Sequence, residues 1–402
     1  MHISLRAALL AGALCLSGAA VHAEPISLSQ AMEQGAAQSP RITQAKALAE
    51  AAEARARQAG VSPNPELSLE VENFAGSGVF QGLRSTEATL ALSQRIELGG
   101  KRSARVAVAE AERDFAFLTY KAALADLDRD IRVAHAELRA DEDRAVLARS
   151  NVSAAEELAR TARLLVDAGR DPPLRQLRAE ATLAEARAEQ ARTFAELLTA
   201  RRLLATLIGS EDAELSATFS EEAPPPNGPV EAPTLNEQLA IAQRGAAQAR
   251  IRLARANAVP DVTASGGVRR FAEGRETALV VGVSIALPFR DRNRGNIEAA
   301  QSESLAAESA AQLARIDANR ERQDARILLG AAEVRYEALA GPGISQAEEA
   351  LRLARIGYNA GKFSLLELLD AQNALTAAKL NLIQARLDRA NALAALIRAN
   401  AQ

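Results

Sequence analysis

The sequence predicts a mainly helical protein that also contains two pairs of β-strands and is built as an internal two-fold repeat. Of its 402 residues, 92 are alanine and only 3% are aromatic, and such small apolar side chains suit closely packed helices. Proline is absent from residues 100–168, so a helix can run through that whole segment. Four other segments alternate apolar and polar residues with a period of two, which is typical of strands.

Composition and motifs argue against nucleic-acid binding and against catalysis. The 48 basic and 51 acidic residues nearly cancel, so no basic face is expected to attract nucleic acid. Gly99–Arg102 lacks the first glycine and the Ser/Thr of a phosphate-binding loop. His135 and Glu137 have the spacing of a zinc deaminase motif without its cysteine pair, so we expect His135 to be a packed or solvated helical residue. We therefore predict no enzyme activity, no cofactor and no dedicated metal site.

Residues 1–23 are predicted to form a signal peptide. Arg6 supplies the positive charge, residues 7–16 form an apolar stretch, and small residues lead to Ala23. We expect cleavage between Ala23 and Glu24, and hence export of the protein.

Two further features limit where an exported chain can reside. Cys15 is the single cysteine, and it follows Leu14 rather than the small residue that lipidation requires, so we expect no lipid anchor and no disulfide. After the signal peptide, no apolar run reaches 18 residues, which argues against a membrane-spanning helix. The protein is then periplasmic, secreted, or part of an outer-membrane barrel.

The repeat has a spacing of 191–192 residues. Asp167–Arg170 recurs as Asn359–Lys362, and Ser93–Leu98 aligns with Ser284–Phe289. We predict a first repeat over residues 24–208, a proline-rich linker over 209–233 that crosses the outside, and a second repeat over 234–402. Each repeat opens with the spacing of a capping box, in which a Ser or Thr is followed three residues later by Gln or Glu: Ser27 and Gln30, Thr234 and Glu237.

Each repeat contains two predicted strands. Their approximate ranges are 65–72, 87–98, 261–271 and 278–289. Strands of about 9–11 residues are long enough to cross a bilayer at a tilt. Pro288 indicates that the last strand leaves its ladder near that residue.

Long helical hairpins are predicted to follow the strands. Residues 100–168 and 295–360 form the long arms, the second interrupted at Gly341–Gly343, and residues 172–208 and 364–400 form the short arms. A helix of 69 residues would be roughly 100 Å long. On the last helix, leucines and alanines repeat at coiled-coil spacing: Leu368, Ala371, Leu375, Ala378, Leu382, Ala385, Ala392, Leu396.

Four strands cannot close a barrel, and an open sheet leaves unsatisfied edges in lipid. Three copies of the chain would supply 12 strands and would arrange the hairpins as a hollow periplasmic α-barrel. The chain therefore either remains soluble with exposed sheet edges or completes a barrel with other copies of itself, and three copies would form a homotrimer with a 12-stranded transmembrane β-barrel. The alternative, a trimeric periplasmic coiled coil without a pore, explains the heptads but leaves the strands without a role.

Several motifs make the chain resemble the TolC-like outer membrane efflux proteins. They are the run ELGGKR (Glu97–Arg102), and Tyr358–Gly361 followed by Leu365–Gln372, together with the order and spacing of the repeat. PNPEL (Pro63–Leu67) and Val71–Phe74 are most similar to the cobalt–zinc–cadmium efflux branch. Aromatic residues beside the strands are few, so the usual interfacial belt is thin: Phe74, Phe80, Phe271, Phe289.

The resemblance implies an outer-membrane channel that extends into the periplasm and contacts outer-membrane lipid. It implies a homotrimer that docks onto a periplasmic membrane-fusion adaptor and, through it, an inner-membrane, proton-driven RND-type pump. The cargo it suggests is divalent heavy-metal cations. Organic drugs or secreted proteins remain alternative cargoes, because cargo choice belongs to the pump.

The resemblance also implies roles for the two hairpin tips. Gly169, Arg170, Gly361 and Lys362 lie at the turns, where the family contacts the adaptor; glycine is also what an ordinary helical hairpin requires there. Glu367 and Asp370 match the acidic pair that narrows the closed periplasmic entrance in the family. The spacing Ser364–Glu367 is in addition a capping box, so Glu367 has a second reading as a cap.

Overall fold

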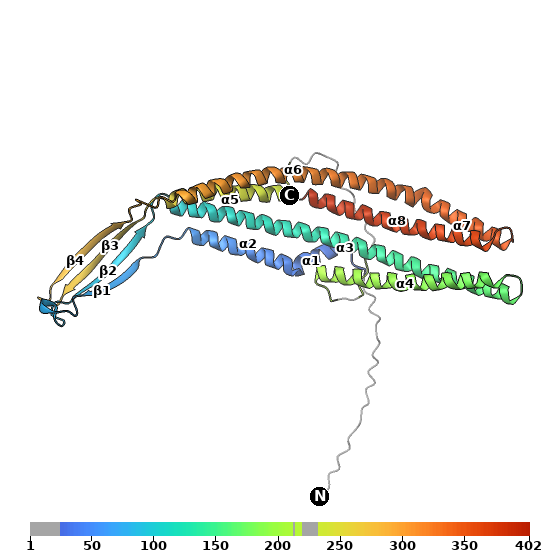
Figure 1. Cartoon of the computed structure of the whole chain (residues 1–402), viewed down its shortest axis with the longest axis horizontal. Helices are drawn as coiled ribbons and strands as arrows, with labels where there is room; N and C mark the ends of the chain where they lie inside the picture. The colour runs from blue at the N-terminus through green and yellow to red at the C-terminus, as the bar shows by residue number, and fades with distance from the viewer. Residues whose placement is uncertain (1–24, 212–213, 219–231) are drawn as a thin grey trace, which may run out of the picture.

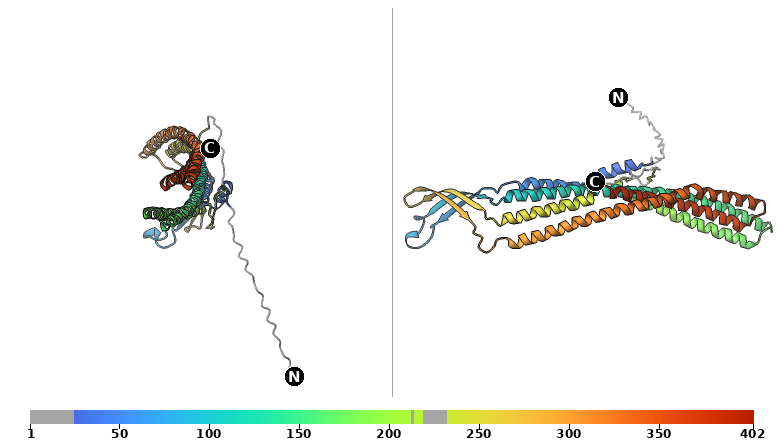
Figure 2. Two further views of the ribbon diagram at one scale, coloured as in Figure 1. Left: turned by 90° about the vertical axis from the view of Figure 1, so that its right-hand side faces the viewer. Right: turned by 90° about the horizontal axis from the view of Figure 1, so that it is seen from above.

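The computed structural model describes residues 25–211, 214–218 and 232–402. The predicted signal peptide and its cleavage site at Ala23 and Glu24 lie outside the described residues. The molecule is elongated, with a sheet at one end and helices along the remaining length (Figures 1 and 2). This architecture confirms the predicted mainly helical fold with a four-stranded β contribution, while the trimeric barrel stays a prediction.

The four strands form one antiparallel sheet in the order β1-β2-β3-β4. The strands are β1 (Glu66–Glu72), β2 (Glu87–Ile96), β3 (Val262–Phe271) and β4 (Thr277–Ile285). The central pair, β2 and β3, comes from different halves of the chain, so the sheet joins the two repeats. One edge of β1 and one edge of β4 have no neighbour in the described chain.

Two strands are shorter than the sequence predicts. β2 ends at Ile96 rather than residue 98, and β4 ends at Ile285 rather than residue 289. Ile96 and Ile285 both pair with Val262, the first residue of β3, so no partner strand remains beyond them. Pro288, which has no N–H to donate, lies past the end of the ladder as predicted.

The sheet has one apolar face, and the protein does not cover it. Cross-strand partners on this face are Leu69, Leu90, Val268 and Leu279 in successive strands. Leu69 is 68% exposed and Leu279 is 84% exposed. The opposite face carries the polar side chains that alternate with these residues, among them Thr89 and Arg269.

The first repeat contains four helices. They are α1 (Leu28–Gln38), α2 (Pro40–Ala59), α3 (Lys101–Asp167) and α4 (Pro173–Ile208). The capping box at Ser27 is present and starts α1. α3 is continuous over 67 residues, and α2 and α4 pack along its two ends.

The second repeat follows the same plan with one break. It contains α5 (Leu235–Asn257), α6 (Arg294–Ala338), α7 (Ile344–Asn359) and α8 (Leu365–Ala399). The capping box at Thr234 is present. The predicted interruption is a π-helical segment, Leu339–Gly343, that contains Pro342. The wider turn accommodates a proline without an N–H, and α7 therefore continues the course of α6 (Figure 1).

The main core lies where the helices of the first repeat meet. Ile131 and Leu138 of α3 and Leu204 and Ile208 of α4 are its largest fully buried side chains. The predicted linker contributes to this core: Leu215 and Ala217 are only 5% and 2% exposed. Backbone hydrogen bonds to Ile26 hold this segment as a short parallel bridge. The prediction that residues 209–233 run over the outside is thus wrong for residues 215–217.

The ELGGKR run builds the junction between sheet and helices. Gly99 and Gly100 adopt positive φ angles of 69° and 74°, which glycine tolerates best, and α3 begins at Lys101. The Lys101 ammonium lies 2.6 Å from the carboxylate of Asp261, just before β3. Burial alone would raise the pKa of Asp261, but bonds from Lys101 and from the Leu98 N–H outweigh it and lower that pKa. The junction therefore fixes both repeats to one sheet.

Candidate functional site

The two hairpin tips lie together at the end of the molecule far from the sheet (Figure 1). At the first tip, α3 ends and Gly169 turns the chain with φ +67°. The Arg170 N–H donates to the Leu165 carbonyl at 2.9 Å, a helix-terminating bond. α4 then begins at Pro173, a position where proline is favoured.

The second tip repeats this backbone geometry. Gly361 has φ +70°, and the Lys362 N–H donates to the Gly357 carbonyl at 2.8 Å. α8 begins at Leu365 with Ser364 as its N-cap. The predicted turn residues thus occupy both tips. A β-carbon added at Gly169 or Gly361 would meet no other atom of the described chain within 4 Å.

Glu367 and Asp370 lie three residues apart at the start of α8, on one side of the helix. The Ser364 N–H donates to the Glu367 carboxylate at 2.6 Å, and the Glu367 N–H donates to Ser364 Oγ at 3.3 Å. The backbone bond from Ser364 lowers the pKa of Glu367, so this carboxylate is held ionised. Glu367 therefore caps the helix while it remains exposed, and the two readings of this residue are compatible.

Asp370 differs from Glu367 in its surroundings. It is exposed, and no hydrogen bond or ion pair to it occurs within the described part of the chain. Within the described residues, no contact of this kind assigns Asp370 a structural role, in contrast to Glu367.

Sequence reasoning missed the residues that occupy the matching positions of the first tip. With the offset of 192 residues that relates Pro173 to Leu365, Arg175 corresponds to Glu367 and Arg178 to Asp370. Arg175 donates to Asp171 at 2.5 Å, whereas Arg178 is exposed. The charge inversion could have been read from the same repeat spacing that located the tips.

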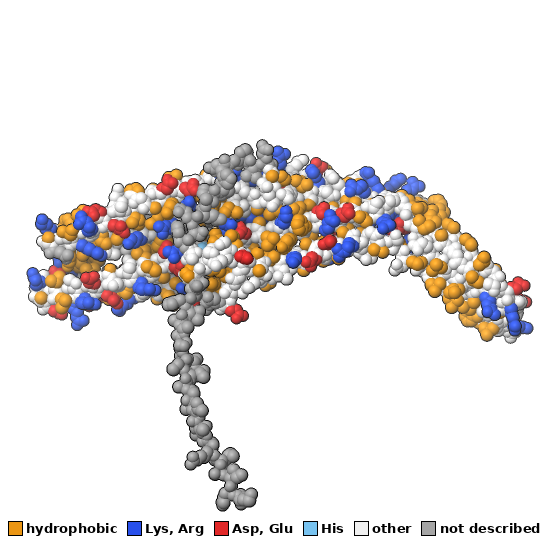
Figure 3. All heavy atoms as spheres, turned by 180° about the vertical axis from the view of Figure 1, so that it is seen from behind, with side chains coloured by type: hydrophobic (Ala, Val, Ile, Leu, Met, Phe, Trp, Pro, Cys, Tyr) orange, Lys and Arg blue, Asp and Glu red, His pale blue; other side chains and the backbone are white. Residues whose placement is uncertain are grey.

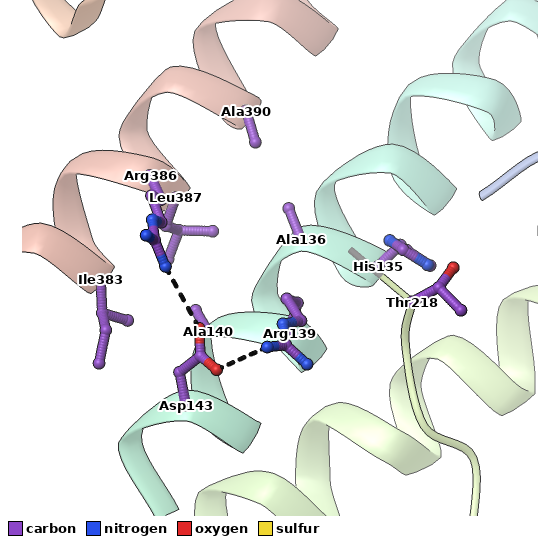
Figure 4. A pocket seen from close by; sticks show the side chains of 10 residues that line it. All are labelled: His135, Ala136, Arg139, Ala140, Asp143, Thr218, Ile383, Arg386, Leu387 and Ala390. Atoms are coloured by element: carbon purple, nitrogen blue, oxygen red, sulfur yellow. Dashed lines mark hydrogen bonds and ion pairs between the residues drawn. The ribbon is translucent and has the colours of Figure 1, made fainter. Parts of the chain in front are cut away.

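A small pocket between α3 and α8 contains the buried His135 (Figure 4). Its Nε2 lies 3.1 Å from the Ile26 carbonyl oxygen. Burial lowers the pKa of His135, so the ring packs in its neutral form, as predicted for a helical packing residue. Asp143 in the same pocket is paired with Arg139 at 2.8 Å and with Arg386 at 3.8 Å. These groups bind one another and join α3 to α8.

Two kinds of feature are absent from residues 25–211, 214–218 and 232–402. No group of three or more His, Cys, Asp or Glu residues in this part of the chain is placed to hold a metal ion. No helix in the same part is both long and apolar enough to cross a membrane.

Sequence comparisons match nearly the whole chain. The family model described as "Outer membrane efflux protein" matches residues 31–210 and 232–402. The "Cobalt-zinc-cadmium resistance protein CzcC" of Cupriavidus metallidurans is 30% identical over 367 residues, which cover 89% of this chain and 86% of that protein. The "Nickel and cobalt resistance protein CnrC" of the same organism is 34% identical over 323 residues, 77% of each chain.

Solved structures show the same fold at lower identity. A membrane protein from Pseudomonas aeruginosa has a TM-score of 0.82 at 22% identity, covering 93% of this chain and 90% of that one. The outer membrane protein VceC from Vibrio cholerae has a TM-score of 0.78 at 23% identity, covering 93% and 95%. The long hairpins and the small sheet are therefore a shared architecture.

Proposed function

The chain belongs to the outer membrane efflux protein family, and from that premise we propose that three copies of it form a closed conduit from the periplasm to the exterior. The protein is an outer-membrane efflux channel homologous to heavy-metal resistance proteins. What remains to be argued is how one chain contributes to a channel, what narrows it and what passes through it.

The observation that carries the proposal is the open sheet with an uncovered apolar face. β1 and β4 each leave one edge unpaired, and unpaired edges are not tolerated in lipid. Three copies would join β4 of one chain to β1 of the next and close a barrel of 3 × 4 = 12 strands. Exposed leucines and valines such as Leu279 and Val281 (84% and 82% exposed) then face the acyl chains.

The helices extend the same conduit into the periplasm. α3 has 67 residues, which at 1.5 Å per residue corresponds to roughly 100 Å. Six hairpins, two from each of three copies, would surround a hollow axis. Small buried side chains such as Ala148, Ala162 and Ala179 let neighbouring helices approach closely.

The tips narrow this conduit at its periplasmic entrance. Glu367 and Asp370 from three copies would place 3 × 2 = 6 carboxylates near one axis, and rings of carboxylates attract cations. Gly169, Arg170, Gly361 and Lys362 form the outermost turns and meet the periplasmic adaptor. We infer that the adaptor links the channel to an inner-membrane, proton-driven RND-type pump, as the resemblance to the family implies.

Divalent heavy-metal cations are the proposed cargo. The support is that relatives covering 77–89% of this chain are named for resistance to cobalt, zinc, cadmium and nickel. A narrowing lined by carboxylates suits the passage of such cations, because it attracts them without binding them tightly.

Two measurements test the proposal. The purified protein, reconstituted in planar bilayers, should give discrete conductance steps and should migrate as a trimer that dissociates on heating. A strain without the gene should become sensitive to cobalt, zinc or cadmium, and the intact gene should restore resistance. Recovery as a soluble protein after osmotic shock would refute the conduit, and sensitivity to organic compounds alone would refute the metal cargo.

A further inference from the structure

Two adjacent arginines at the far end of β3 have opposite surroundings. The side chain of Arg269 lies on the polar face of the sheet, where it is paired with Glu87 at 3.0 Å, with Glu72 at 3.3 Å and with Thr89 at 2.9 Å. Arg270 points to the other face, because neighbouring residues of a strand alternate. It is exposed and makes no hydrogen bond or ion pair within the described residues.

The register places Arg270 on the apolar face. Its cross-strand partners are Ala88 in β2 and Thr277 in β4. The next residue on the same face of β3 is Val268, which pairs with Leu90 and Leu279. A cation thus lies at the end of an exposed apolar surface, and no carboxylate among the described residues is paired with it.

In the proposed barrel, Arg270 would lie near the boundary between acyl chains and headgroups. Eight residues separate it from Val262, which is roughly 26 Å along the strand and about 20 Å of height at the usual tilt. The apolar band of such barrels is about 25 Å tall, and a long arginine side chain extends past the apolar layer to place its charge in the headgroups. Figure 3 shows hydrophobic side chains over the sheet and charged side chains gathered at its far end.

Two more arginines lie in the loops at this end. Arg84 precedes β2 and Arg275 lies between β3 and β4; both are exposed and without an ion pair in the described part of the chain. The same loops contain two carboxylates, Glu273 and Glu276, which offset the charges of the two loop arginines, so Arg270 is the cation of the apolar face itself. Phe74, Phe80 and Phe271 lie at the same end, so a few aromatic rings would anchor this rim together with the cations.

We propose that Arg270, supported by Arg84 and Arg275, binds the phosphate groups of lipid A in the outer leaflet of the outer membrane. The inference rests on the proposed barrel, in which the helices lie on the periplasmic side and this end of the sheet faces outward. The outer leaflet presents a glycolipid with phosphates on its sugar headgroup, at the height that Arg270 reaches. The planar guanidinium can bind a phosphate through two parallel N–H bonds.

The test uses the full-length trimer in nanodiscs of neutral lipid, titrated with diphosphoryl or monophosphoryl lipid A. We expect Arg270→Ala to weaken binding of diphosphoryl lipid A about tenfold, which corresponds to about 1.4 kcal/mol. Arg270→Lys should retain part of the affinity, because lysine keeps the positive charge but lacks the two parallel N–H donors of the guanidinium. Monophosphoryl lipid A should bind the wild-type protein more weakly and respond less to the substitution.

Arg269→Ala is the matched control, since it removes the same charge from the opposite face. It should leave lipid A binding unchanged. Equal weakening by both substitutions, or no weakening by Arg270→Ala, would overturn the inference, as would full competition by phosphatidylglycerol, which points to phospholipid headgroups. If the wild-type protein inserts and conducts while Arg270→Ala has no effect, only this inference fails; if the wild-type protein does not conduct, the proposed channel fails.

Discussion

The two hairpin tips have the same backbone and opposite charges. Both turn at a glycine with positive φ, +67° at Gly169 and +70° at Gly361, and in both the residue after the glycine donates back to the helix. At equivalent places on the following helix, however, the first tip has Arg175 and Arg178 and the second has Glu367 and Asp370. The two tips therefore share the turn and differ in the charges beside it.

This difference teaches which features serve folding and which serve function. A helical hairpin requires the left-handed glycine and a cap, and both tips supply a solution for each. It does not require any particular charge on the exposed side of the next turn. We propose that the second tip supplies an acidic entrance, with the arginines of the first tip beside it.

The largest expected effect comes from removing the acidic pair. With Glu367→Ala and Asp370→Ala together, we expect the concentration of Co²⁺ that half-blocks the channel to rise about tenfold, or about 1.4 kcal/mol, because six carboxylates leave the proposed ring. The resting leak should also increase. Single-channel conductance in planar bilayers, with Co²⁺ added on the side of the tips, measures both quantities.

Arg178→Ala is the control for this pair, because Arg178 occupies the position equivalent to Asp370. It should leave the block unchanged or slightly stronger. If the half-blocking Co²⁺ concentration stays unchanged when both Glu367 and Asp370 are replaced, these residues do not form the gate. The charge difference between the two tips would then have no role in ion entry.

Because both tips turn at a glycine with positive φ, we expect equal losses of stability when either glycine is replaced. Gly169→Ala and Gly361→Ala should each lower the free energy of unfolding by roughly 1 kcal/mol, since a β-carbon is disfavoured at positive φ. Space is not the cause, because no atom lies within 4 Å of either added β-carbon. Thermal melting of the purified protein in detergent measures the two losses.

Gly245 in α5 supplies a matched control. It also has open space around it but lies inside a helix with ordinary φ. Gly245→Ala should therefore raise the melting temperature, because alanine favours helix. A loss at only one of the two tips would mean that their backbones are not equivalent in solution.

The sequence was sufficient for local features and insufficient for features that depend on distant neighbours. The capping boxes at Ser27 and Thr234 and the positions of the turns follow from short patterns, and the structure contains them. The ends of β2 and β4 could not be predicted, because they depend on where β3 begins. The burial of Ala217 could not be predicted either, since its partner, Ile26, lies 191 residues away. At the candidate site, the acidic pair was predicted and its basic counterpart was missed because each motif was read alone.

Capping provides a smaller test, because only the second tip has a side-chain cap. Ser364→Ala should lower stability by between about 0.5 and 1 kcal/mol at neutral pH. The Ser364 bonds lower the pKa of Glu367 below its ordinary 4.5. A carboxylate with a lowered pKa stabilises the fold above its ordinary pKa, and this contribution is lost as pH falls through the lowered value.

Ser364→Ala keeps the backbone N–H that is the main cause of the lowered Glu367 pKa and loses only the hydroxyl. The difference in melting temperature between wild type and Ser364→Ala should therefore narrow only in part below pH 4.5. Lys362→Ala, two residues away and without a side-chain bond in the described chain, should show little change at any pH. A difference that stays constant as Glu367 becomes protonated would mean that the cap does not depend on this carboxylate.

The smallest expected effect comes from making the first tip resemble the second. Arg178→Asp would replace three cations by three carboxylates in the trimer, at the positions equivalent to Asp370. If the tips of both hairpins approach one axis, the half-blocking Co²⁺ concentration should fall about threefold, or roughly 0.6 kcal/mol, and Arg178→Ala should give a part of that change. The effect is expected to be smaller than removal of the acidic pair, because Arg175 and its partner Asp171 remain beside the new carboxylate.

The half-blocking Co²⁺ concentration could instead stay unchanged with Arg178→Asp while it rises as predicted in the acidic double variant. That result would mean that the second hairpins alone line the entrance. The two tips would then differ in position within the assembly as well as in charge.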